Sequence, residues 1–218
     1  MNALIVADGD MPTRATLDRL LAKSGPDLVV AADGGALKAV LLGYAPHVVV
    51  GDADSLPAEA AQRLSEGGAE VIVHPASKDE SDTELALREA VRRGAATLLV
   101  VGAFGGARLE HTIANLLLLC LPDLRGRDVR MADGASVVRL LDGSDSLTVE
   151  GAPGDLVSLL PLTPRVEGVT TSGLAYPLSG EALDQGPARG LSNVMTGSKA
   201  AVSASVGRLL VIHTLTDR

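Results

Sequence analysis

The sequence has very little cysteine and very few aromatic residues. Its only cysteine is Cys120, so no disulfide can form within the chain, and a reducing compartment is expected. Tryptophan is absent, and the aromatic residues are two tyrosines and one phenylalanine. Proteins that bind single-stranded nucleic acid usually stack bases on aromatic rings and carry runs of lysine and arginine. Neither feature is present and the net charge is −8, so nucleic acid is not an expected partner.

Long hydrophobic runs are also missing. The longest apolar stretch, residues 116–121, is far shorter than the roughly 18 residues that a membrane span requires. The first apolar run lacks a basic start and ends before Asp8, so it is expected to be a buried strand rather than a secretory signal. We therefore expect a cytoplasmic protein without a membrane segment. Its 218 residues, 46% of them apolar, are enough to bury a sizeable core.

The first half of the chain alternates short apolar runs with segments of helical periodicity. This pattern predicts repeated βαβ units and a Rossmann-like parallel sheet with flanking helices. The expected strands are residues 3–7, 28–32, 48–50, 70–74, 97–102 and 129–132. The expected helices are residues 13–23, 35–42, 58–66, 82–93 and 110–120. Because the strands are almost continuously apolar, we expect both faces of this sheet to be covered.

The second half has a different texture, with short β-branched runs separated by Gly, Pro, Ser and Asp. This spacing predicts an antiparallel sandwich or barrel, and we expect the sandwich. The expected strands are residues 136–141, 146–149, 156–160, 166–170, 190–195, 199–205 and 208–214. We therefore expect two domains, an α/β domain over residues 1–134 and a β-sandwich domain over residues 135–218.

Two acidic clusters directly follow predicted strands. Asp33-Gly34-Gly35 could let a phosphate or ribose approach the backbone, although such a turn is also a routine strand-to-helix connection. Asp52 and Asp54 are spaced by one residue, so their carboxylates could converge on one Mg²⁺ ion. The alternative is a solvated acidic turn, but neighbouring carboxylates at the end of a buried strand repel each other unless a positive charge lies between them.

Two further polar clusters follow the fourth and fifth predicted strands. In the first, Ser81 and Glu84 fit a helix capping box, while Asp82 could either stabilise the helix dipole or bind metal. Lys78 of the same cluster could offset phosphate charge. The second cluster is a glycine loop, residues 102–110, that leads through Arg108 into a helix carrying His111 and Asn115 on one face.

In this order, the four clusters resemble the motifs of the thiamine pyrophosphokinase family. The matching elements are Asp33-Gly34-Gly35, Gly51-Asp52-Ala53-Asp54-Ser55, residues 78–87 and residues 105–115. Two C-terminal elements, residues 171–178 and Gly190-Leu191-Ser192-Asn193, extend the resemblance over nearly the whole chain. It implies an enzyme that transfers a diphosphate group from ATP to thiamine, releasing AMP.

The resemblance also implies roles for individual residues. Asp52, Asp54 and Asp82 would hold Mg²⁺ and, with Arg108, form the catalytic group. The ATP site would comprise Asp33, Gly34, Gly35, Lys78, Gly105, Gly106, Arg108 and His111. Thiamine would be bound by Ser192, Asn193 and Asp82, and the site would be completed across a homodimer.

The chain departs from the family pattern at three points. Glu110 stands where aspartate is usual, Ala107 is an extra residue before Arg108, and no tryptophan is available to pack on thiamine, which leaves aliphatic side chains or Tyr176. Three other functions use some of the same residues: a diphosphokinase for another hydroxymethyl heterocycle such as a pterin, a metal-dependent glycosyltransferase, and a non-catalytic thiamine or nucleotide sensor. A glycosyltransferase function would not explain the clusters at residues 78–82 and 105–115 or the presence of the second domain.

Overall fold

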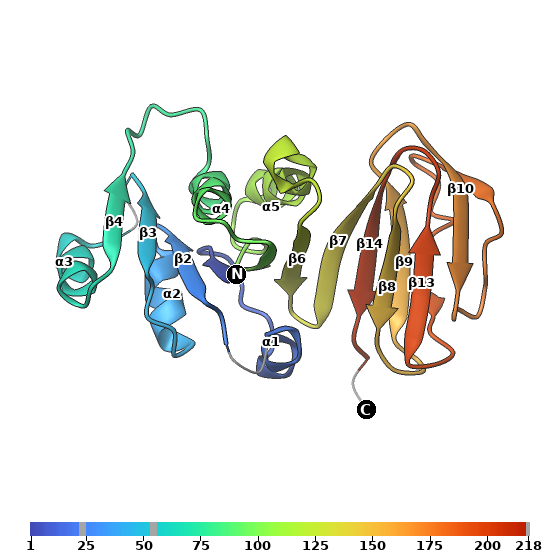
Figure 1. Ribbon diagram of the computed structural model, residues 1–218, viewed down its shortest axis with the longest axis horizontal. Coiled ribbons are helices and arrows are strands. Elements are labelled where there is room, and N and C mark those ends of the chain that lie inside the picture. Colours follow the sequence, from blue (N-terminus) through green and yellow to red (C-terminus); the bar gives the residue numbers. More distant parts are fainter. Residues whose placement is uncertain (22–24, 53–55, 217–218) are drawn as a thin grey trace. The chain divides into compact units, whose positions relative to one another are not determined.

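The computed structural model describes residues 1–21, 25–52 and 56–216, which form two compact units, Met1–Gly134 and Ala135–Arg218. Figure 1 shows the α/β unit and the all-β unit along the chain. No helix in these described ranges is both long and apolar enough to cross a membrane.

Unit 1 contains a parallel sheet in the strand order β4-β3-β2-β1-β5-β6. Its strands are β1 (Asn2–Val6), β2 (Leu28–Ala32), β3 (Val48–Gly51), β4 (Glu70–Val73), β5 (Thr97–Val101) and β6 (Asp128–Asp133). Its helices are α1 (Arg14–Leu20), α2 (Gly35–Leu41), α3 (Ala58–Glu66), α4 (Asp82–Arg92) and α5 (Leu109–Leu117), followed by the 3₁₀ turns η1 (Leu118–Cys120) and η2 (Pro122–Leu124). The predicted Rossmann-like architecture is confirmed, with bounds that differ from the expected ones by at most three residues.

Helices cover both faces of this sheet, because most of its strands are apolar on both sides. Helices α1, α2 and α3 lie on one face and α4 and α5 on the other (Figure 1). On the first face Leu17 of α1 and Ala39 of α2 pack against Leu4 and Val6 of β1. The edge strand β4 is the exception, since Glu70 and Val73 at its ends are exposed.

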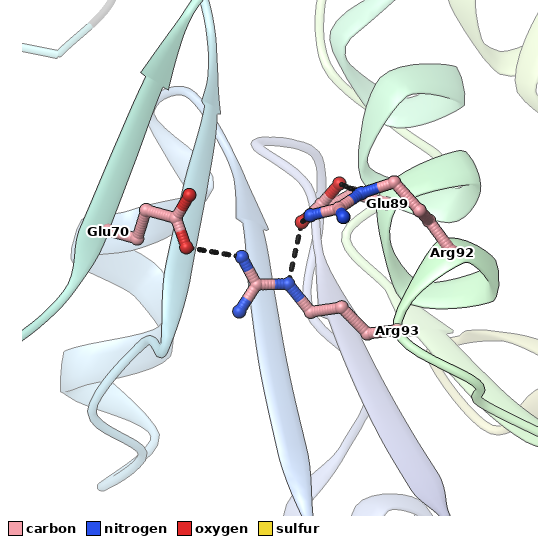
Figure 2. Close-up of polar contacts among 4 residues, drawn as sticks. All are labelled: Glu70, Glu89, Arg92 and Arg93. Carbon is pink, nitrogen blue, oxygen red and sulfur yellow. Dashed lines mark hydrogen bonds and ion pairs between the residues drawn. The ribbon is translucent and has the colours of Figure 1, made fainter.

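A charged network ties the end of α4 to this edge strand (Figure 2). Glu89 accepts hydrogen bonds of 2.7 Å from Arg92 and 2.6 Å from Arg93, and Arg93 also reaches Glu70 of β4 at 2.5 Å. Hydrogen bonds from Arg92 and Arg93 lower the pKa of Glu89, although its partial burial opposes them. The network is therefore strongest at pH values above the ordinary carboxyl pKa. It weakens in acid, as Glu89 takes up a proton.

Unit 2 is a sandwich of two antiparallel sheets, as predicted. One contains β12-β9-β14-β7 and the other β11-β10-β13-β8. Its strands are β7 (Ser136–Asp142), β8 (Ser146–Glu150), β9 (Leu156–Pro161), β10 (Arg165–Ser172), β11 (Glu181–Asp184), β12 (Asn193–Val194), β13 (Lys199–Ser203) and β14 (Arg208–Thr214). Side chains from both sheets, among them Val157, Val166, Val202 and Leu209, form its core.

Two details of unit 2 differ from the sequence prediction. Strand β11 was not expected, since its four residues carry only a short apolar signal. The strand expected over residues 190–195 is reduced to Asn193–Val194. Ser192 adopts a left-handed backbone with φ of +58°, which interrupts an extended strand.

Candidate functional site

Three aspartates from separate loops meet at one edge of the sheet in unit 1. Asp33 follows β2, Asp52 follows β3, and Asp82 is the first residue of α4. One carboxylate oxygen from each lies within 4.8 Å of those of the other two. They meet because parallel strands end at the same edge of a sheet, where open α/β folds bind their ligands.

The backbone holds Asp33 in an unusual conformation. Its φ is +43°, and its N–H donates a 2.8 Å hydrogen bond to the carbonyl oxygen of Val50 in β3. A left-handed backbone is costly for residues other than glycine and is tolerated best by Asp and Asn. A side chain at Gly51 would lie 2.9 Å from Cβ of Asp33, so glycine at position 51 allows the Asp33 side chain to reach the cluster.

Lys78 lies among the carboxylates. Its Nζ is 2.9 Å from Asp82 Oδ1 and 3.3 Å from Asp52 Oδ2, and the Lys78 side chain is only 10% exposed. Desolvation works against its charged form, but the hydrogen bonds to Asp82 and Asp52 outweigh it and raise the pKa of Lys78. The ammonium group therefore stays charged and offsets part of the carboxylate repulsion.

A pocket of about 390 Å³ lies beside this cluster. Eight of the residues singled out in the sequence line it: Asp33, Gly34, Lys78, Asp82, Gly105, Gly106, Arg108 and His111. Asp52 does not line the pocket, but it forms an ion pair with Lys78, which does. Asp54 lies outside the described residues.

Gly35, which was also predicted to belong to the ATP site, has a packing role. A side chain there would lie 2.1 Å from the carbonyl oxygen of Val6, so glycine allows the start of α2 to approach β1. Gly35 itself does not line the pocket.

The opposite wall is built by the loops after β1 and β5, which bind each other through backbone hydrogen bonds. Gly9 N–H donates to Gly102 O at 2.6 Å, and Asp10 N–H donates to Phe104 O at 2.7 Å. Buried Asn115 fixes the glycine loop from behind, since its Nδ2 donates to Ala103 O at 2.7 Å. Both Asn115 and His111 line the pocket, but Asn115 is committed to shaping the loop.

Arg108 and Glu110 form an exposed ion pair at the mouth of the pocket. Arg108 Nε lies 2.7 Å from Glu110 Oε1, and about two thirds of each side chain is exposed. The hydrogen bond from Arg108 lowers the pKa of Glu110. Such an exposed pair is weak, so the guanidinium can turn from Glu110 to an anionic ligand at little cost.

The predicted thiamine residues of unit 2 lie on a structured loop. Asn193 Oδ1 accepts hydrogen bonds from the N–H groups of Tyr176 and Val194, and its Nδ2 donates to Tyr176 O at 2.6 Å. Asn193 therefore fixes the backbone of Tyr176, whose side chain is 73% exposed. Ser192 is exposed, and its N–H donates to Ser158 Oγ at 2.9 Å.

Several pocket residues were not assigned a ligand-binding role from the sequence. They include Asp8, Gly9, Glu80, Ser81, Thr83, Gly102, Ala103 and Ala107. Ser81 was interpreted only as a cap, and its Oγ does accept from Glu84 N–H at 3.2 Å. Asp8 follows β1 just as Asp33 follows β2, so the same strand-end argument could have identified it.

Comparison with known proteins gives a family match in each half of the chain. Residues 18–131 match the family model described as "Thiamin pyrophosphokinase, catalytic domain", and residues 146–210 match "Thiamin pyrophosphokinase, vitamin B1 binding domain". The second match lies in the second half of the chain, which the glycosyltransferase alternative did not explain.

Relatives match over most of their length. The thiamine pyrophosphokinase of Bacillus subtilis is 24% identical over 187 residues, covering 86% of this chain and 87% of the relative. A crystal structure of a thiamin pyrophosphokinase family protein from Enterococcus faecalis superposes with a TM-score of 0.82 at 30% identity, covering both chains completely. The crystal structure of the thiamin pyrophosphokinase from Geobacillus thermodenitrificans superposes with a TM-score of 0.81 at 30% identity. The match covers 100% of this chain and 98% of that chain. The chain belongs to the thiamine pyrophosphokinase family.

Proposed function

We propose that the pocket of unit 1 binds ATP and that the family's reaction takes place there, with thiamine receiving a diphosphate group and AMP being released. The observation that carries this assignment is the convergence of Asp33, Asp52 and Asp82 within 4.8 Å, with Lys78 among them. Their convergence beside a glycine-lined pocket suits a ligand with several phosphate groups.

The carboxylate cluster is also suited to Mg²⁺. Its donors are hard oxygens, and Mg²⁺ in nucleotide sites is commonly held by one or two carboxylates together with phosphate oxygens. Asp52 and Asp82, with Asp54 from the sequence motif, would hold the ion, and Asp33 would belong to the same acidic group. When bound, the ion would neutralise phosphate charge during transfer.

Residues of the chain itself supply the remaining charge neutralisation. The hydroxyl oxygen of thiamine attacks the β-phosphorus of ATP, and the bond to the oxygen bridging the α and β phosphorus atoms breaks to release AMP. Lys78 and Arg108 would stabilise the negative charge on the transferred group and on the leaving phosphate. A carboxylate of the cluster would accept the hydroxyl proton. His111, Gly105 and Gly106 would complete the phosphate wall.

For thiamine, we propose Ser192 and Asn193 in unit 2 and, separately, Asp82 in unit 1. Asn193 would act indirectly, by holding Tyr176 in place through hydrogen bonds to its backbone N–H and C=O. The exposed ring of Tyr176 would supply the aromatic contact in a chain that has no tryptophan.

The direct test is to incubate purified protein with Mg-ATP and thiamine and to quantify AMP and thiamine diphosphate. We expect equimolar formation of both products, dependent on thiamine and on Mg²⁺. A hydroxymethyl pterin offered in place of thiamine should give no AMP above background. AMP release that does not depend on thiamine, or binding of both ligands without turnover, would contradict the assignment.

We also propose a cytoplasmic protein, because its only cysteine is Cys120 and its substrate ATP is abundant in that compartment.

We propose further that the chain works as a homodimer, and helix α5 supports this. Within α5, all of which is described, only Asn115 is buried. Leu109, Ile113 and Leu117 recur every four residues along one side and are 70%, 51% and 50% exposed. At about 100° per residue this side faces away from His111 and Asn115, so these side chains are not part of the pocket. Apolar stripes of this kind are usually covered by a partner.

Light scattering should therefore give a mass of two chains for the wild-type protein. Replacing Ile113 by Glu should shift the mass towards one chain, because a buried carboxylate would lie in the contact. Replacing Thr112 by Glu is the matched control on the neighbouring helix position. A wild-type monomer, or a dimer that is insensitive to Ile113→Glu, would contradict this use of α5.

A further inference from the structure

Asp8 is a third aspartate in the wall of the proposed ATP pocket, beside Asp33 and Asp82, and it lies outside the carboxylate cluster. It is the second residue after β1 and lines the pocket together with Gly9 and Gly34. Its side chain is 57% exposed, so the carboxylate is open to a ligand. A carboxylate facing a triphosphate pocket is electrostatically unfavourable unless it has a partner of its own.

Lys38 of α2 fixes the position of this carboxylate. Lys38 Nζ lies 3.1 Å from Asp8 Oδ1, and it also donates to the carbonyl oxygens of Asp8 and of Gly9, the latter at 2.7 Å. One ammonium group therefore binds both the side chain and the backbone of the loop. The ion pair offsets the charge of Asp8, and Oδ2 remains on the side of Gly34.

Gly34 brings Asp8 close to the carboxylate cluster. A Cβ atom on Gly34 would lie 2.8 Å from Asp8 Oδ2, so the carboxylate rests against the backbone of the residue that follows Asp33. Asp33, the residue before Gly34, belongs to the cluster that would hold metal and phosphates, so Asp8 adjoins the loop that carries this cluster. A nucleotide group next to the phosphates can reach it.

The sheet order points to the same place. In the order β4-β3-β2-β1-β5-β6 the connections run in opposite directions on either side of β1 and β5. Ligands of open α/β sheets bind at such a switch point, outside the carboxyl ends of the strands. Ala7, Asp8 and Gly9 are the pocket residues that follow β1, and Gly102 follows β5.

We propose that Asp8 accepts a hydrogen bond from the ribose hydroxyls of the nucleotide and so selects ribonucleotides over deoxyribonucleotides. An ionised carboxylate can only accept hydrogen bonds, and the phosphates of the nucleotide offer no donor. The ribose hydroxyls are the donors that adjoin the phosphates, whereas the base lies one ring further away. This inference rests on the proposed function, because it requires that the pocket binds ATP.

The test compares ATP with 2′-deoxy-ATP and 3′-deoxy-ATP in wild-type protein and in Asp8→Ala. We expect the wild type to prefer ATP over at least one deoxy analogue by about 10- to 100-fold in kcat/KM, as for a hydrogen bond to a charged group. In Asp8→Ala this preference should almost disappear. ATP loses the hydrogen bond to Asp8, whereas the deoxy analogue never formed it. Asp18→Ala is the matched control, since Asp18 is also an exposed aspartate paired with a basic side chain, Arg14 at 2.8 Å, and it does not line the pocket.

A purely electrostatic or structural role for Asp8 would change kcat/KM equally for all three nucleotides. Equal changes, or a wild type without any preference, would overturn the proposal. Calorimetric titration with AMP, 2′-deoxy-AMP and 3′-deoxy-AMP repeats the comparison without turnover. If thiamine-dependent AMP release fails but the AMP series still depends on Asp8, the proposed reaction is wrong while the ribose contact stands.

Discussion

Replacing Asp82 by Asn should lower kcat/KM for thiamine-dependent AMP release by about 10²- to 10³-fold, the size of effect seen when one preorganised electrostatic group is removed. The substitution keeps the shape of the side chain but removes a charge from the cluster with Asp33 and Asp52. The Mg²⁺ concentration needed for half-maximal activity should rise as well, because an amide is a poorer ligand than a carboxylate. On the sequence argument, Asp54→Asn is expected to behave in the same way.

Stability should change little in Asp82→Asn. Asp82 is the first residue of α4, where a negative charge contributes about 0.3–1 kcal/mol through the helix dipole. The matched control is Asp79→Asn, which removes the charge of an exposed aspartate that does not line the pocket. If Asp82→Asn retains near-normal rates and an unchanged Mg²⁺ requirement, the metal assignment is wrong.

Replacing Asp155 by Ala should destabilise the protein by several kcal/mol, because each buried donor left without a partner costs about 1–3 kcal/mol. Asp155 is 2% exposed. Its Oδ2 accepts from His213 Nε2 at 2.9 Å and from Ala152 N–H at 3.0 Å, and its Oδ1 accepts from Thr216. This carboxylate connects β14 to the loop before β9, so Asp155→Ala would leave several buried donors unsatisfied.

The same group predicts an acid dependence of stability. Burial by itself would raise the pKa of Asp155, but the hydrogen bonds from His213, Ala152 and Thr216 together hold it below its ordinary value. A carboxyl group with a lowered folded-state pKa contributes stability that is present above its unfolded pKa and is lost as the pH falls through the folded value. The melting temperature should therefore fall in acid, and this contribution to the fall should be missing in Asp155→Ala.

Calorimetry over a pH series measures both effects. Asp145→Ala is a suitable control, because Asp145 is an exposed aspartate of the same unit whose carboxylate accepts a hydrogen bond from the neighbouring Ser146 N–H. If Asp155→Ala melts at the wild-type temperature at neutral pH, the energetic role assigned to the pair is wrong.

The amino-acid sequence by itself determined the architecture and the family. Apolar runs of strand length separated by helical segments predicted the parallel sheet, since both periodicities are local properties of the chain. Because parallel strands end at one edge, the acidic clusters after successive strands could also be expected to meet there. Asp33, Asp52 and Asp82 do meet, and the order of their motifs identified the family.

Only the tertiary structure decided which polar side chains are open to the pocket and which form hydrogen bonds that support the backbone. Asn115 and Asn193 carry similar sequence signals to the ligand-facing residues, yet their amides hold the backbone of Ala103 and Tyr176. Asp8 lies next to the Gly102 loop because β1 pairs with β5, a contact between segments some 95 residues apart. The Asp155–His213 pair likewise joins residues 58 positions apart. Local periodicity specifies elements, whereas such pairings arise only when the packed sheets bring distant residues into register.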